Sequence, residues 1–368
     1  MSTTYAPPLA YTPTMEVVPD DEPETIRELT ESLLKISKIT HAHSGHAMRS
    51  VHAKCHGILR GELQVLADLP PGYAQGVFQP GARYPVIVRL STPPGDLLPD
   101  DVSVPRGWAM TLVGVDGDRL PGSEGERTQD FVMVDAPTFL APDAKHFARS
   151  LVLLAAVTDR AERTKEVLST LLRGTERVLE RLGMPSGRIK ALGGHPMTHI
   201  LGESFHTQAA LLHGPYMAKL SLVPVSESLQ ALIEHPLDLK DHPFGLRDAV
   251  KAWFATQGGE WLLRAQLCND TEAMPIEDPS VPWPESHSPH VPLARLVLPS
   301  QLAWDDERSP AVDDRLSFSP WHGIAAHRPI GSVMRVRRQA YAASAAFRGE
   351  HNGCPMHQPR AADEPFIG

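Results

Sequence analysis

Two short stretches of the sequence contain residues that could perform acid–base chemistry. The first is Arg49–Lys54, which contains His52, and the second is Pro85–Thr92, which contains Arg89 and Ser91. An imidazole can move a proton, and a hydroxyl can hydrogen-bond the imidazole and orient it. Guanidinium groups bind carboxylates through paired hydrogen bonds. The combination predicts acid–base chemistry on a small oxygen compound beside an anionic cofactor.

Both stretches are predicted to be β-strands that pair across a turn-rich connection. They contain β-branched valines, and the second stretch alternates apolar and polar residues toward its end. The proline- and glycine-rich segments 68–72 and 79–81 between them are typical of turns. Pairing of the two strands would place His52 and Ser91 at one cavity.

The bulk composition is that of a soluble globular protein. The 368 residues are 42% hydrophobic and 21% charged, with a formal net charge of −9. The negative charge argues against a nucleic-acid partner, and no apolar run reaches the length of a membrane span. The beginning of the sequence lacks the features of a secretory signal. The three cysteines show no CxxC spacing, which favours the reducing cytoplasm.

The chain is predicted to form one domain between two terminal segments. Residues 1–22 are rich in proline, threonine and acidic residues, which predicts a flexible arm, and residues 346–368 form a tail. The domain spans residues 23–345 and begins with a helix over about 24–37, where apolar residues recur at helical spacing. The other elements expected in it are barrel strands over about 50–135 and 214–300, a hairpin turn at Asp116-Gly117, a helical insert over about 143–183 and a helix over about 335–347.

Three stretches resemble segments of the haem catalase family. Arg49–Lys54 resembles the family's Arg-x-Val-His-Ala-Lys-Gly strand, and Pro85–Thr92 resembles Pro-Val-x-Val-Arg-Phe-Ser-Thr, with Leu90 in place of phenylalanine. Asp101–Ala109 resembles the Asp-x-x-x-x-Pro-Arg-Gly-Phe-Ala segment, with one residue fewer before the proline. The resemblance runs from about residue 49 to 300 and on to about 340. It implies an α+β fold, a catalase-like antiparallel β-barrel with appended helices.

The resemblance also implies a site that binds haem b and acts on a peroxide. His52 would be the distal acid–base residue, and Ser91 would hydrogen-bond the ring nitrogen that His52 does not use for chemistry. Arginines would neutralise the haem propionates or tune the proximal side, because a guanidinium grips a carboxylate with two hydrogen bonds. The residues implied to bind the cofactor are Arg49, Arg89, Phe131 and Arg315.

The distal side departs from the family pattern at one position. Catalases carry an asparagine before a Thr-Pro-x-Phe-Phe strand, whereas Glu126 falls opposite it here and Gln129 is the nearest amide. Without an amide donor, efficient dismutation of hydrogen peroxide is not expected, and peroxidase-type activity stands beside catalase activity.

The proximal side departs further. Catalases ligate the iron through the tyrosine of an Arg-x-x-x-Tyr motif. Counted from Arg315, the tyrosine position holds Ser319. Aligned instead from His327–Gly331, which resembles the family's His-Arg-Leu-Gly, it holds Trp321. The adjacent His322 is therefore expected as the iron ligand. Tyr341 lies farther along and is assigned to no motif.

The sequence thus predicts a haem-dependent hydroperoxidase, of catalase or peroxidase type, for hydrogen peroxide or organic hydroperoxides in an oxidative stress response. The alternative is a haem-free catalase-fold protein that binds a lipid or another apolar ligand. The missing tyrosine favours this alternative, whereas the retained histidine, serine and arginines argue against it, because an apolar pocket has little use for them. A homo-oligomer is also considered, since catalases are often tetramers.

Overall fold

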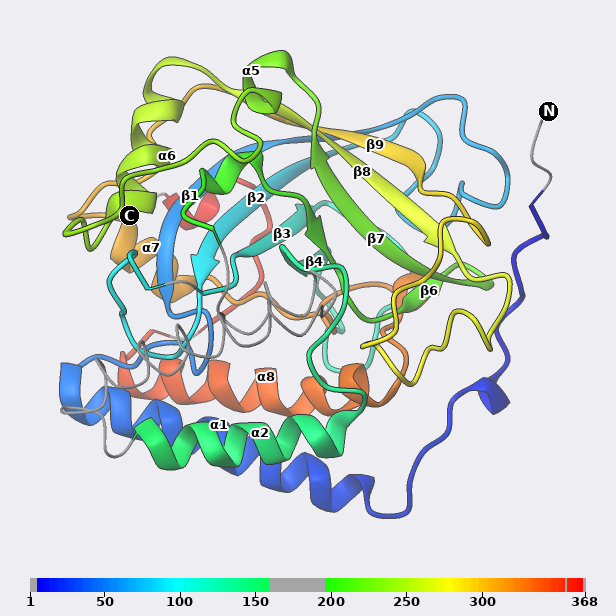
Figure 1. Ribbon diagram of the computed structural model, residues 1–368, viewed down its shortest axis with the longest axis horizontal. Helices are drawn as coiled ribbons and strands as arrows, with labels where there is room; N and C mark the ends of the chain where they lie inside the picture. Colours follow the sequence, from blue (N-terminus) through cyan, green and yellow to red (C-terminus); the bar gives the residue numbers. More distant parts are fainter. Residues whose placement is uncertain (1–4, 103, 159–195, 355, 367–368) are drawn as a thin grey trace, which may run out of the picture.

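The computed structural model describes residues 5–102, 104–158, 196–354 and 356–366, and its centre is a β-barrel (Figure 1). The order of the antiparallel strands is β5-β4-β3-β2-β1-β9-β8-β7-β6, and β5 also pairs with β7. This additional pairing closes the barrel and removes its open edges. Three long helices, α1, α2 and α8, form a layer on one side (Figure 1). The expected fold class, an α+β catalase-like barrel with appended helices, is confirmed.

The bounds of the elements are as follows. The strands are β1 (Lys54–Val65), β2 (Arg83–Thr92), β3 (Gly107–Val113), β4 (Thr128–Val134), β5 (Phe205–His206), β6 (Leu211–His213), β7 (Tyr216–Pro224), β8 (Gly259–Leu267) and β9 (Val291–Leu298). The α-helices are α1 (Glu22–Ser44), α2 (Ala144–Thr158), α5 (Glu227–Gln230), α6 (Gly245–Thr256), α7 (Ser309–Arg315) and α8 (Ser332–His351). Short 3₁₀ helices are Pro13–Met15, Ile200–Gly202, Ala325–His327 and Glu364–Phe366. The part of the predicted helical insert from residue 159 onward lies outside the described residues.

Two local predictions are wrong. His52 does not lie on a strand, because its φ is 54° and such a left-handed backbone cannot continue a β-ladder. It lies in the bend between α1 and β1, and the strand begins at Lys54. The connection from β3 to β4 is also longer than a two-residue turn at Asp116-Gly117, since the amides of Gly114 and Val115 both donate to the carbonyl of Arg127.

Strand β2 is buried on both faces, and the two faces have different chemistry. Its burial increases along the strand until the last seven residues are all buried. Val86, Val88 and Leu90 belong to the large apolar core inside the barrel. Successive side chains of a strand point to opposite faces. Arg89 and Ser91 therefore point outward, toward the helices, and this outer face carries the polar chemistry.

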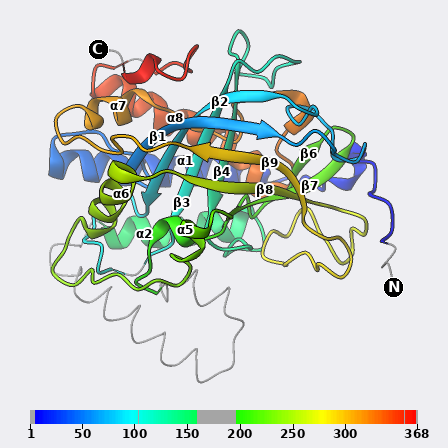
Figure 2. The ribbon, with the colours of Figure 1, turned by 90° about the horizontal axis from the view of Figure 1, so that it is seen from above.

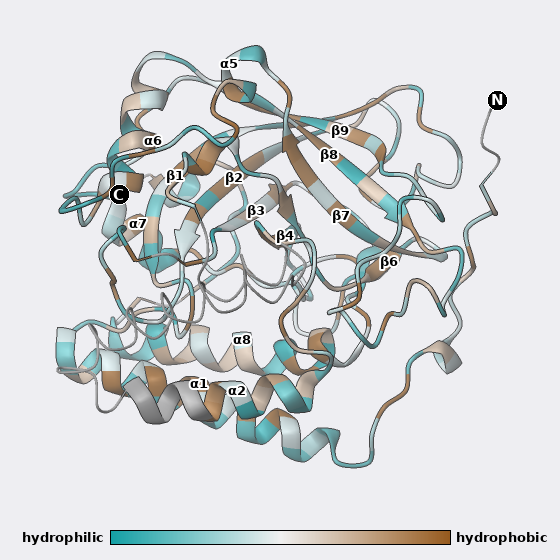
Figure 3. Cartoon of the chain, in the orientation of Figure 1, coloured by the Kyte–Doolittle hydropathy of each residue, from teal (hydrophilic) through white to brown (hydrophobic). Residues whose placement is uncertain are grey.

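The barrel interior is filled by large apolar side chains. Trp108 and Trp261 are fully buried with their ring centroids 5.2 Å apart. Figure 3 shows hydrophobic stretches along the barrel strands. Burying one large apolar side chain contributes about 1.5–3 kcal/mol to the folding free energy. Because such interiors are closely packed, the barrel is a rigid support for groups on its outer face.

The helical layer has its own small core, formed where α1, α2 and α8 meet. Leu29 and Leu33 of α1 pack with Val336 and Ala340 of α8. Figure 2 shows the barrel strands from above, with this layer behind them. None of the helices in the described part of the chain is long and apolar enough to cross a bilayer.

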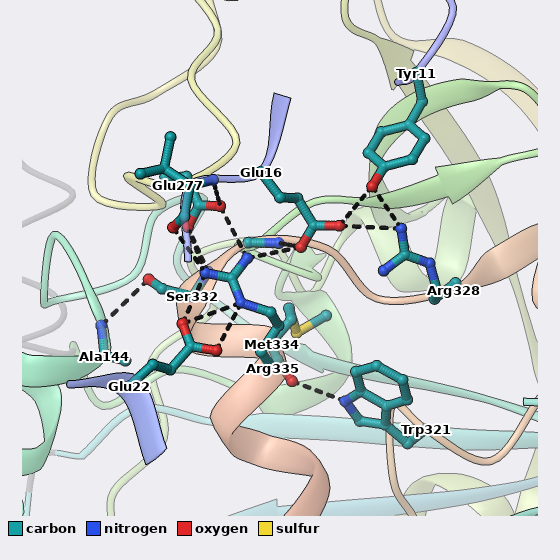
Figure 4. Close-up of polar contacts among 12 residues, drawn as sticks. Tyr11, Glu16, Glu22, Ala144, Glu277, Trp321, Arg328, Ser332, Met334 and Arg335 are labelled. Carbon is teal, nitrogen blue, oxygen red and sulfur yellow. Dashed lines mark hydrogen bonds and ion pairs between the residues drawn. The ribbon is translucent and has the colours of Figure 1, made fainter. Parts of the chain in front are cut away.

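The N-terminal arm is not a loose segment over residues 5–22, contrary to the prediction. An isolated bridge joins Ala10 to the first residue of β7. Figure 4 shows the Arg335 guanidinium of α8 surrounded by three carboxylates, Glu16 at 2.7 Å, Glu22 at 2.8 Å and Glu277 at 2.9 Å. The arm thereby ties the start of α8 to the barrel.

Candidate active site

A cavity lies between the outer face of β2 and β3 and helix α8. On β2 its wall contains Arg89 and Ser91, and their partners across the ladder are Ala109 and Gly107 of β3. Because the partners are small, they leave room above the sheet. The cavity holds about 90 Å³ for the centres of water-sized molecules and about 710 Å³ of empty space when its open mouth is included. The enclosed part is large enough for a molecule of the size of a small peroxide.

His52 and Ser91 meet in this cavity as the sequence predicts. Their Nδ1 and Oγ atoms are 3.3 Å apart. Gly107 makes this approach possible, because a Cβ at this position would lie 2.6 Å from His52 Nδ1 and 2.7 Å from Ser91 Oγ. Within the described residues, the second ring nitrogen, Nε2, has no hydrogen-bond partner. This nitrogen is the one available for chemistry.

His52 is a neutral imidazole at physiological pH. Burial, together with the positive charge of Arg89, lowers its pKa to about 4. A neutral imidazole can accept a proton and return it in a later step. The geometry and charge state thus fit an acid–base residue.

Arg49 and Arg89 both line the cavity, but a carboxylate of the protein already binds them. Asp313 of α7 receives Arg49 Nη1 at 2.8 Å and Arg89 Nε at 2.7 Å on Oδ1, and Arg89 Nη2 at 3.1 Å on Oδ2. Burial alone would raise the pKa of the Asp313 carboxyl, but the charges of the two arginines hold it well below its usual range. Asp313 was not singled out by the sequence, because no local motif contains it.

Arg348 is the third arginine of the cavity, and its guanidinium is only partly satisfied. Nη2 donates to the carbonyl of Leu316 at 3.1 Å, whereas the buried Nε and Nη1 lack a hydrogen-bond partner in the described structure. Burial, followed by repulsion from Arg49, lowers its pKa well below the usual value. Buried donors without partners are costly and point to an anionic ligand that they would bind.

Tyr341 of α8 lines the same cavity as His52. Its phenol hydroxyl makes no hydrogen bond within the described residues, and its side chain is partly exposed to the cavity. Tyr341 was assigned to no motif from the sequence, although Arg337 precedes it by four positions, the spacing of an Arg-x-x-x-Tyr motif. Arg348 follows Tyr341 by seven positions, two helical turns, so both side chains lie on one face of α8.

Three other predicted site residues lie elsewhere. The ring of Phe131 points into the barrel core, where it stacks on Phe78 with centroids 6.0 Å apart. Arg315 ends α7 and is not part of the cavity wall. His322 is not part of this cavity wall but lines a wider pocket that adjoins it and shares Ser317, Tyr341 and Ala345 with it.

His322 is held by acidic and amide groups rather than directed at His52. Its Nδ1 lies 3.1 Å from Asp130 Oδ2 and 2.8 Å from Gln358 Nε2. Although burial lowers the pKa of His322, the hydrogen bond and charge of Asp130 raise it above its usual value. Because metals bind the neutral ring, a raised pKa makes His322 a weaker candidate for a metal ligand. Groups of three or more His, Cys, Asp or Glu that could hold a metal ion are absent from the described residues.

An amide group is absent from the cavity wall as far as the structure describes it. Gln129, the nearest amide in the sequence, accepts a hydrogen bond from the amide of Ile324 at 3.0 Å and lies buried elsewhere. Glu126 is also outside the cavity wall, and burial raises its pKa. The described cavity wall thus lacks the side-chain amide that catalases carry on the distal side.

The fold matches that of catalases. A bacterial catalase is similar to this chain with a TM-score of 0.59 and 17% identity over 96% of this chain and 66% of its own. A fungal catalase has a TM-score of 0.57 and 17% identity, and the match covers 88% of this chain and 63% of the fungal one. Catalase A from Saccharomyces cerevisiae has a TM-score of 0.56 and 15% identity, and the match covers 87% of this chain and 65% of the yeast one. The chain thus spans about two thirds or less of the length of these catalases. No family model and no curated protein matches the sequence. The resemblance carried by the three sequence motifs is confirmed at the level of the fold.

Proposed function

We propose that this catalase-fold protein is a haem-dependent hydroperoxidase that acts on hydrogen peroxide or organic hydroperoxides. The observation that carries the proposal is that one cavity contains His52, with its Nε2 unpartnered among the described residues, and the phenol of Tyr341. These are the two side chains that a haem peroxidase site of the catalase kind requires, one for proton transfer and one for the iron.

The residues of the cavity fit a haem. Tyr341 would supply an oxygen ligand to the iron, and Arg348, whose Nε and Nη1 lack partners among the described residues, would bind a propionate. Arg49 and Arg89 add positive charge at the same wall. When bound, haem supplies iron-centred redox chemistry. Tyr341 replaces His322 as the proposed ligand because Tyr341 shares a cavity with His52.

The chain's own contribution is proton transfer and orientation. Ser91 fixes the His52 ring through Nδ1, which leaves Nε2 to take a proton from one peroxide oxygen and return it to the other. Because His52 is neutral above about pH 4, it can act as a base throughout the physiological range. The absence of an amide side chain from the described cavity wall favours peroxidase-type activity over rapid dismutation.

The absorption spectrum of protein produced with a haem precursor tests the cofactor and its ligand. We expect a Soret band that is retained in His322→Ala and lost or shifted in Tyr341→Phe, with circular dichroism showing that both variants fold. An unchanged spectrum in Tyr341→Phe would exclude this residue as the ligand. A folded wild-type protein without a Soret band would remove the haem proposal.

Peroxide consumption tests the role of His52. Loss of a positioned general acid–base typically lowers a rate by about 10²–10⁴-fold. We expect a decrease of this size in His52→Ala, while the Soret band persists. An unchanged rate would show that His52 does not move the proton.

The second candidate is a haem-free protein that binds a lipid or another apolar ligand in this cavity. The observation that favours it is the largely apolar wall, which includes Leu33, Val132 and Phe318. Under this candidate, Arg348 would bind the carboxylate of a fatty acid. Tight binding of a fatty acid by protein that stays colourless after haem reconstitution would select it.

A further inference from the structure

Of the three arginines in the described cavity wall, Arg49 and Arg89 share one carboxylate of the protein itself. The Asp313 carboxylate lies between Arg49 and Arg89 and contacts both within 3.1 Å. Their other described hydrogen bonds go to backbone carbonyls, such as Arg49 Nη2 to Leu316 at 2.8 Å and Arg89 Nη1 to His52 at 2.9 Å. All three nitrogens of the Arg89 guanidinium and both terminal nitrogens of Arg49 therefore have partners within the protein.

The third arginine differs in this respect. Arg348 keeps two buried N–H-bearing nitrogens, Nε and Nη1, without partners in the described structure. It is 3% exposed, so water does not readily satisfy them. A ligand carboxylate that enters the cavity thus finds donors at Arg348 and a carboxylate already in place at the other two arginines.

We propose that Asp313 is an internal carboxylate that occupies the seat between Arg49 and Arg89 and directs the carboxylate of a ligand to Arg348. Asp313 comes from α7, outside the cavity wall, and it presents its two oxygens to arginines that do line the wall. It acts by limiting the number of external carboxylates that the cavity binds strongly. The inference rests on the proposed function only where the ligand is haem.

A rescue experiment without haem tests whether Asp313 occupies a carboxylate-binding site between Arg49 and Arg89. In Asp313→Ala, the two arginines face a space of the size of the lost carboxylate. We expect this variant to unfold at lower temperature than the wild type and to be stabilised by sodium acetate more than by sodium chloride at equal ionic strength. The wild type and Asp314→Ala, a change at the neighbouring carboxylate that pairs with His46 instead, should respond alike to both salts.

Two outcomes of this experiment would overturn the proposal. One is the absence of acetate-specific stabilisation in Asp313→Ala, and the other is an equal effect in the wild type. Asp313→Ser, which retains one oxygen for the arginines, is measured in parallel so that a folded variant is available. If both variants remain unfolded in chloride, refolding in acetate tests the proposal instead. Recovery in acetate alone supports a carboxylate-binding site between Arg49 and Arg89, and equal failure in both salts contradicts it.

A comparison of haem with its dimethyl ester tests the effect on ligand choice. The ester lacks both free carboxylates, so the dissociation constant of the ester divided by that of haem measures how much the carboxylates contribute to binding. We expect this ratio to increase at least tenfold in Asp313→Ala, to decrease toward one in Arg348→Leu, and to change little in Arg49→Leu. A ratio that is unchanged in Asp313→Ala would refute the assignment. If neither porphyrin binds to any variant, the proposed function fails, while the acetate experiment still decides the role of Asp313.

Discussion

Replacement of Gly107 by alanine is the sharpest test of the His52–Ser91 arrangement. The new Cβ would lie 2.6 Å from His52 Nδ1 and 2.7 Å from Ser91 Oγ, and the nearest ring carbon would be 2.8 Å away. Contacts below 3.0 Å essentially do not occur for a real Cβ, so one of the two side chains has to move. Overpacking of this kind costs about 1–3 kcal/mol of folding stability. The hydrogen bond that is lost contributes about 0.5–1.5 kcal/mol more.

The effect on function should exceed the effect on stability, because the ring of His52 loses its fixed orientation. We expect the rate of peroxide consumption to fall by at least about tenfold at an unchanged Soret absorbance, within the range of general acid–base contributions. Gly57→Ala is the matched control, since its Cβ would lie 2.9 Å from Val250 Cγ1, within the barrel and away from the cavity. The reasoning is refuted if Gly107→Ala keeps full activity, or if Gly57→Ala loses as much activity at the same loss of stability.

Two further predictions concern stability. Burial lowers the pKa of His199 and His213 to about 4 and that of His327 to about 3, below the value of about 6.5 in an unfolded chain. Between those values these three imidazoles alone bind about three more protons in the unfolded chain than in the folded one, so the stability that they contribute above about pH 6.5 is lost as the pH falls. The loss is on the order of 4 kcal/mol per pH unit near pH 5. Urea unfolding at pH 7, 6 and 5 measures it, and equal midpoints at all three values would contradict it. Arg335→Met should lower the unfolding free energy by about 3 kcal/mol by leaving three carboxylates without their shared cation. Arg338→Met on the same helix should cost less than about 1 kcal/mol, and equal losses would show that the cluster contributes nothing.

Sequence reasoning succeeded where the signal was local. Alternation along Pro85–Thr92 predicted a strand, and the strand places Arg89 and Ser91 on the face that carries the cavity. The pairing of His52 with Ser91 followed from the order of two short motifs. The barrel class followed from the same motifs and from the turns that separate the strands.

The rest of the site depends on contacts between distant segments. Asp313 is 264 residues from Arg49 in the sequence, and only the packing of α7 against the barrel reveals their ion pair. Tyr341 carries a local signal, its spacing from Arg337, but it lies beyond Arg315, whose neighbouring residues resemble the catalase motif, and it was therefore assigned to no motif. His52 was placed on a strand because propensity gives little information about a single left-handed residue in a bend.

The composition of the cavity has a consequence for the order of biosynthesis. His52, Ser91 and Gly107 leave the ribosome early, whereas Tyr341, Ser344 and Arg348 belong to α8, which is made after every strand of the barrel. Part of the apolar face of α1 also remains uncovered until α8 packs on it. A nascent chain can therefore form its barrel before it has a ligand site, and any cofactor is acquired only at the last folding step. Before α8 is made, α7 already contacts the outer face of β2 through Asp313 and Arg89, but the cavity beside them is still open, and exposed surface of this kind is what chaperones protect.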